Sequence, residues 1–257
     1  MVKFLRLATC TVAVVFAAVA SGAQLAYEPV GLAWTAEQVE RASAAEMRAL
    51  IGRAEQAELL GCRAHCERLA RVFARVVVEA RAQTVRSAAL PWSLTVVRLP
   101  DLDAMARPDG QLVISETFID LRLESDEALA FVLAHEMAHS ILEHERQALT
   151  FARMLLPRQV ARSVRDMYVE MDFNLALFKA MEPVMQQGEY EADELGMLLA
   201  SAAGYDPDRQ LAFIEHECHA DSGAVPLVVT HPPACLRLRA LQSLLPLARR
   251  QRPVDGK

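Results

Sequence analysis

The sequence predicts an α+β fold that is mainly helical and contains a small β-sheet. Of its 257 residues, 53% are hydrophobic but only 6% are aromatic. The core is therefore expected to consist of Ala, Leu, Val and Met, a composition that favours helices over strands. Most of the chain has helical periodicity, and two short β-branched segments interrupt it. Since no repeat or low-complexity linker divides the chain, a single domain over residues 24–257 is expected.

Two long helices are expected in the first third of the chain. Thr35 can cap a helix that runs to about residue 57, and Gln38 stands where a capping box requires it. A second helix is expected over residues 62–81, because its apolar side chains share one face.

Two strands follow these helices. Residues 93–99 and 111–115 are rich in β-branched side chains, and Pro108-Asp109-Gly110 between them is a turn sequence. Ser125-Asp126-Glu127 then begins a helix with a cap and two acids in its first turn, where the helix dipole favours them. That helix carries residues 129–144. The remaining expected helices cover residues 151–187 with breaks at Pro157 and Pro183, residues 189–203, and a last segment after Pro233.

The first residues predict a targeting segment. Lys3 and Arg6 precede an apolar stretch, and Ser21-Gly22-Ala23 suits cleavage, so residues 1–23 are expected to be a signal peptide. The expected location is periplasmic or otherwise exported, and the alternative is an uncleaved membrane anchor. The formal net charge of −6 argues against nucleic acid as a partner.

Four cysteines remain after such a cleavage. Cys62 and Cys66 are four residues apart in a helical pattern, and Cys218 and Cys235 flank His231. Each pair could form a disulfide in an oxidising compartment. The alternative is four free thiols, because pairing does not follow from spacing alone.

The segment His135-Glu136-x-x-His139 carries the strongest chemical signal. Two His four residues apart on a helix lie on one face, so both imidazoles can bind one zinc ion. Glu136 lies one step round the helix and is placed to take a proton from water. The alternative, two surface His on an amphipathic helix, is disfavoured because the flanking residues are apolar and buried polar groups need partners.

A catalytic zinc needs a third protein ligand. Glu189 and Asp193 share one helical face, whereas Glu191 points away from it. We therefore expect Glu189 to bind the metal and Asp193 to orient a ligating imidazole. Gly196 lies on the same face and would let this helix approach the His helix closely. The alternative is an ordinary acidic helix start with exposed carboxylates.

Two further His residues, His231 and His144, bear on this site. His231 precedes two prolines that stiffen its loop, so it is either a hydrogen-bond donor to the transition state or a displaceable fourth ligand. The alternative is a rigid loop without a catalytic part. His144 is expected nearly opposite His135 on the same helix, outside the site.

Together these motifs resemble the CAAX prenyl protease-like zinc endopeptidases, family forty-eight of the metallopeptidases. The similar segments are Met105 to Gly110, Ser125 to Ala130, His135 to His139, Glu189 to Asp193 with Gly196, Gly204 to Pro207, and His231 to Arg237. Ala138 is a departure, because members usually carry Gly there.

The resemblance implies a zincin-like, gluzincin site with one zinc ion per chain and Glu189 as third ligand. It implies that Arg237 supports the site together with Asp193, and that the strand near residues 112–115 pairs with extended substrate. The expected function is endoproteolysis of misfolded envelope proteins, with membrane-associated partners. The alternative is a zinc-containing chaperone or assembly factor with little proteolytic activity.

Overall fold

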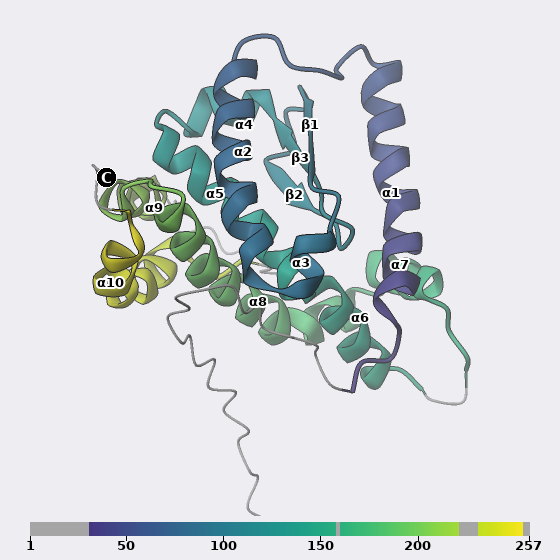
Figure 1. The fold of residues 1–257 in the computed structure, drawn as a ribbon. Helices are drawn as coiled ribbons and strands as arrows, with labels where there is room; N and C mark the ends of the chain where they lie inside the picture. Colours follow the sequence, from purple (N-terminus) through teal and green to yellow (C-terminus); the bar gives the residue numbers. More distant parts are fainter. Residues whose placement is uncertain (1–30, 158–159, 221–230, 254–257) are drawn as a thin grey trace, which may run out of the picture.

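The computed structural model describes residues 31–157, 160–220 and 231–253. In these ranges helices pack around a small sheet, as Figure 1 shows, and the predicted fold class is confirmed. The predicted leader, residues 1–23, lies outside the described residues and stays a prediction. The elements are α1 (Ala36–Gln56), α2 (Cys66–Gln83), α3 (Val85–Ala89), β1 (Ser93–Val97), β2 (Ala104–Ala106), β3 (Gln111–Ser115), α4 (Glu116–Arg122), α5 (Asp126–Ile141), α6 (His144–Leu155), α7 (Val164–Phe173), α8 (Leu175–Ala202), α9 (Pro207–Ala220) and α10 (Ala234–Gln251).

The sheet lies between helices on both of its faces. Its order is β1-β3-β2, with β3 parallel to β1 and antiparallel to β2. Leu112 and Ile114 join the core formed with α2 and α5, whereas Val113 packs with Met47 of α1. Because side chains alternate along a strand, β3 is buried on both faces. Figure 1 shows α1 on one side of the sheet and α2 on the other.

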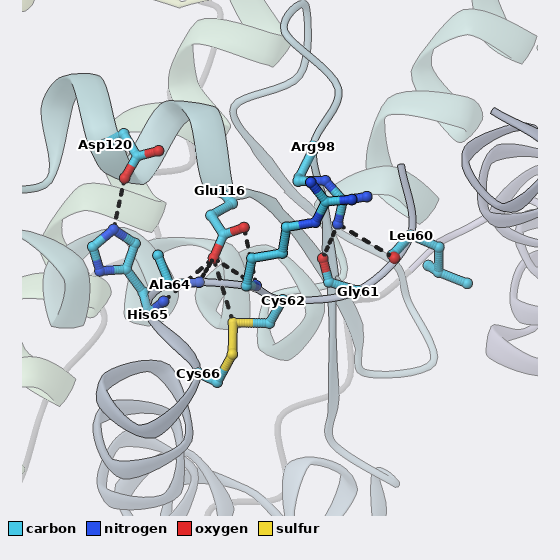
Figure 2. The surroundings of a disulfide bond; sticks show 10 residues. Leu60, Gly61, Cys62, Ala64, His65, Cys66, Arg98, Glu116 and Asp120 are labelled. Atoms are coloured by element: carbon cyan, nitrogen blue, oxygen red, sulfur yellow. Dashed lines mark hydrogen bonds and ion pairs between the residues drawn. A yellow bond between two sulfur atoms is a disulfide. The ribbon is translucent and has the colours of Figure 1, made fainter. Parts of the chain in front are cut away.

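The second helix begins four residues later than predicted. Residues 62–65 form a loop closed by a disulfide between Cys62 and Cys66. The carboxylate of Glu116 accepts the backbone N–H groups of this loop, at 3.0 Å from Arg63 and 2.6 Å from Ala64. Figure 2 shows Glu116 pointing into the loop beside the disulfide. The negative charge thus satisfies amides near the start of α2, where the helix dipole favours an anion.

The helix that carries the His motif ends earlier than predicted. It stops at Ile141, and Glu143 adopts a left-handed conformation with φ of 57°. The Glu143 side chain is buried and ion-paired, at 3.1 Å from Arg146 and 3.2 Å from Arg86. Since a non-glycine residue pays for this conformation with strain, the two arginines stabilise the break. His144 therefore begins a new helix, α6.

The predicted break at Pro183 is wrong. Pro183 lies inside α8, which runs without interruption from Leu175 to Ala202. The predicted separate helix over residues 189–203 is wrong for the same reason, because these residues continue α8. The predicted caps hold: Thr35 and Gln38 form the capping box of α1, and Ser125 caps α5. No helix in the described ranges is both long and apolar enough to span a membrane.

Candidate metal centre

The three side chains expected to bind zinc lie together between α5 and α8. His135, His139 and Glu189 each offer one ligand atom, and these atoms lie within 4.8 Å of one another. Nε2 of His135 is 3.4 Å from Oε2 of Glu189, and Nε2 of His139 is 3.5 Å from Oε1. The two imidazoles share one face of α5 because they are one helical turn apart.

These residues fit a zinc ion. Two imidazole nitrogens and one carboxylate oxygen are a donor set of catalytic zinc sites. Glu189 is only 8% exposed, and its Oε2 atom accepts no hydrogen bond of good geometry among the described residues. A buried carboxylate oxygen without a well-aligned donor is costly, so a cation at this point would remove an energetic penalty.

On its Nδ1 side, which faces away from the metal centre, His135 contacts a carboxylate that is itself bound by an arginine. Its Nδ1 atom is 3.0 Å from Oδ1 of Asp193. Arg237 donates one hydrogen bond to each oxygen of this carboxylate, at 2.7 Å to Oδ2 and 2.5 Å to Oδ1. Burial alone would lower the pKa of His135, but the carboxylates of Asp193 and Glu189 raise it to about 10. Burial alone would raise the pKa of Asp193, but Arg237 and His135 hold it below its ordinary value. Asp193 thus faces His135, and Arg237 in turn faces Asp193.

His139 has a corresponding pair of neighbours that the helical pattern of the sequence does not predict. Its Nδ1 atom is 2.9 Å from Nδ1 of His144, whose Nε2 atom is 3.2 Å from Oε2 of Glu191. The expectation that His144 lies outside the site is wrong, because the break at Glu143 turns α6 away from the line of α5. The sequence does contain a signal, a His five residues after the motif. On a continuous helix, however, that His would point away from the metal-binding face.

Glu136 faces a cavity of about 680 Å³ that His139, Glu189 and His231 also line. The backbone N–H of Ala106 donates a hydrogen bond to its carboxylate. Burial raises the pKa of Glu136 to about 7, although the positive charge of His135 opposes this shift. A carboxylate with such a pKa is suited to exchange protons near neutral pH.

His231 also reaches the centre. Its Nε2 atom lies 3.3 Å from Oε2 of Glu189, the same oxygen that faces His135, and 61% of its side chain is exposed. A disulfide between Cys218 and Cys235 joins the end of α9 to the start of α10, close to His231 in sequence. Both roles weighed from the sequence, displaceable ligand and hydrogen-bond donor, are compatible with this position.

The expectation that residues 112–115 pair with substrate is wrong. They belong to β3, which already has a neighbour on each side. β2 is instead an edge strand within the described residues, and Ala104 and Ala106 line the cavity. Asp103 and Arg107 hydrogen-bond with β3. In an antiparallel pair the residues between them, Ala104 and Ala106, direct their backbone groups to the outer edge.

Comparisons with known proteins agree with this site. The model of peptidase family M48 matches residues 64–245. Mitochondrial metalloendopeptidase OMA1 of Schizosaccharomyces pombe is 29% identical over 167 residues, which are 63% of this chain and 49% of that protein. The mitochondrial metalloendopeptidase OMA1 of Homo sapiens is 25% identical over 177 residues, 61% of this chain and 33% of that protein. The chain spans about half the length, or less, of these relatives.

Peptidases of this family depend on zinc, so the predicted cofactor and the predicted enzyme class, a zinc metallopeptidase, are confirmed at the level of the family. The predicted periplasmic location is wrong by the same comparison. The relatives are named as mitochondrial proteins, and none is named as periplasmic. The prediction depended on the leader sequence and on a resemblance to exported members of the family.

Proposed function

Because this chain belongs to peptidase family M48, we propose that it is a zinc-dependent endopeptidase that cleaves misfolded or unfolded polypeptides. In this proposal His135, His139 and Glu189 hold the zinc ion, and Glu136 is the catalytic base. The observation that carries it is that His135, His139 and Glu189 can share one ion, while Glu136, His139 and Glu189 line one cavity beside an open strand edge.

Each residue has a distinct part in the reaction. Zinc, when bound, supplies a Lewis acid that activates water and polarises the scissile carbonyl. Glu136 takes a proton from the attacking water and delivers it to the leaving amine. The N–H of Ala106 favours the ionised form of the Glu136 carboxylate. Asp193 accepts a hydrogen bond from Nδ1–H of His135, so that Nε2 presents its lone pair to the metal.

The proposed substrate class follows from β2. An added strand is recognised mainly through main-chain hydrogen bonds, which any extended sequence can make. The outward N–H and C=O groups of Ala104 and the C=O of Ala106 are available for this purpose, whereas the N–H of Ala106 is used by Glu136. A folded substrate keeps its main chain paired, so this edge favours unfolded segments. A role in protein quality control is therefore the proposed biological setting.

The test compares the wild-type chain with Glu136→Gln. Both proteins are purified, their zinc content is measured, and cleavage of casein is followed in the same samples. Glu136→Gln should keep its zinc and lose cleavage by about 10²- to 10⁴-fold, since the amide cannot accept the proton. Cleavage at the wild-type rate would refute the role of Glu136. A wild-type protein that binds zinc but cleaves nothing would favour a chaperone or assembly factor instead.

A further inference from the structure

Both His residues of the motif present their Nε2 atoms to the centre and their Nδ1 atoms to a neighbour. Asp193 meets Nδ1 of His135, and His144 meets Nδ1 of His139. Each neighbour has its own partner, Arg237 for Asp193 and Glu191 for His144. Glu191 is in turn held by Gln187, whose amide donates to Oε1 at 2.9 Å. The centre is therefore supported by two separate series of hydrogen bonds, and each includes a carboxylate of α8, Asp193 or Glu191.

We propose that His144 and Glu191 act as positioning residues that fix the tautomer and orientation of His139 for zinc. This inference rests on the proposed role of His139 as a ligand.

The hydrogen-bond partners of His139 and His144 allow only one pair of neutral tautomers when His139 binds the metal. If Nε2 of His139 binds the metal, the proton of this neutral imidazole is on Nδ1. Nδ1 of His144, at 2.9 Å, must then accept that proton in a hydrogen bond. The proton of His144 therefore lies on Nε2, which faces the Glu191 carboxylate at 3.2 Å. Glu191 thus determines the tautomer of His144, and His144 determines that of His139.

The surrounding packing holds His144 in place. Its side chain is only 10% exposed. A Cβ atom added at Gly188 of α8 would lie 3.4 Å from the His144 ring, so α8 packs close to the imidazole at this point. The left-handed Glu143, with its two arginines, places His144 at the start of α6. These contacts limit the rotation of the ring and give the hydrogen bond to His139 a defined direction.

The test measures zinc affinity, by competition with a chelator, in variants of the whole chain. His144→Leu removes the acceptor and should lower the affinity by about 10- to 100-fold, as Asp193→Asn should on the other side of the centre. His144→Asn places an amide oxygen near the position of Nδ1 and should restore most of that loss. Glu191→Ala should lower the affinity, whereas Glu194→Ala, an exposed carboxylate on the same helix, should not.

The rescue distinguishes positioning from a merely structural role. Equal affinities in His144→Asn and His144→Leu would overturn the proposal, whether both are reduced or both match the wild type. If His144→Leu does not fold, Glu191→Ala decides, and wild-type affinity in that variant overturns the proposal. His139→Ala tests the underlying assignment. If His139→Ala loses zinc and Glu191→Ala does not, the positioning role of His144 and Glu191 is rejected, but the assignment of His139 as a ligand is kept. If His139→Ala keeps its zinc, both the ligand role of His139 and the positioning role of His144 and Glu191 are rejected.

Discussion

Gly196 lies directly against the backbone of His135. A Cβ atom built on Gly196 would be 2.8 Å from the backbone nitrogen of His135 and 2.9 Å from its Cα atom. Real Cβ atoms do not approach backbone this closely, so α8 can pack at this distance from α5 because position 196 has no side chain. The short separation brings Glu189 and Asp193 of α8 to the imidazoles of α5.

Replacing this glycine should therefore damage both stability and metal binding. Gly196→Ala should lower the free energy of unfolding by about 1–3 kcal/mol, the usual cost of overpacking, and should weaken zinc binding. Gly52→Ala is the matched control, because Gly52 lies in α1 with open space around its Cβ position. That control should raise stability by about 0.5–1 kcal/mol. Denaturant unfolding and a zinc titration of both variants provide the check, and wild-type behaviour of Gly196→Ala would contradict the packing argument.

The strand edge makes a prediction about substrate binding. Proline is tolerated where an edge-strand N–H points away from the sheet. Ala104→Pro should therefore leave the fold intact but remove one hydrogen bond to substrate, lowering kcat/KM by about 2- to 10-fold. Met105→Pro removes an N–H directed at β3 and should instead destabilise the protein. Kinetics with a peptide substrate and thermal unfolding of both variants test this. Unchanged kcat/KM in Ala104→Pro would exclude the edge as the binding surface.

The two possible roles of His231 predict opposite effects of its removal on cleavage. Because it reaches the same oxygen of Glu189 as His135 does, we expect it to act as a displaceable ligand that restrains the resting enzyme. His231→Ala should then raise basal cleavage and make the zinc more accessible to chelators. Casein cleavage and the rate of zinc loss to a chelator are measured on the same preparation. Lower turnover with unchanged metal retention would favour a hydrogen-bond donor to the transition state, and no change in either would remove both roles.

Glu116 should make stability depend on pH. Burial alone would raise the pKa of Glu116, but hydrogen bonds from the backbone amides of Ala64, Arg63 and His65 hold it below its ordinary value. Its contribution is therefore complete above the unfolded-state pKa of about 4.3 and is lost as pH falls through the lower, folded-state pKa.

Glu116→Gln should accordingly cost about 1–2 kcal/mol of unfolding free energy at pH 7. The difference from wild type should shrink as the pH falls below about 4. Urea unfolding at several pH values measures this difference. Glu124→Gln, at an exposed position nearby in sequence, is the control and should match the wild type. A difference that stays constant down to acid pH would show that the charge of Glu116 is not responsible.

The sequence by itself determined the features that depend on local geometry. The spacing of His135 and His139 on one helix, and of Glu189 and Asp193 on another, follows from 3.6 residues per turn, and the structure has both pairs as expected. The caps at Thr35 and Ser125 and the two main strands were predictable for the same reason, since each depends on residues a few positions apart.

Tertiary structure alone decided which elements meet. The strand order makes β2 the edge, although β3 has the stronger sequence pattern, because pairing partners are chosen by packing between distant segments. His144 reaches His139 because Arg86 and Arg146, from other turns and helices, stabilise a break at Glu143 that no local residue preference predicts. Helical periodicity predicts the direction of a side chain only as long as the helix axis continues unbroken. Where a buried ion pair changes that axis, side chains expected on opposite faces come into contact.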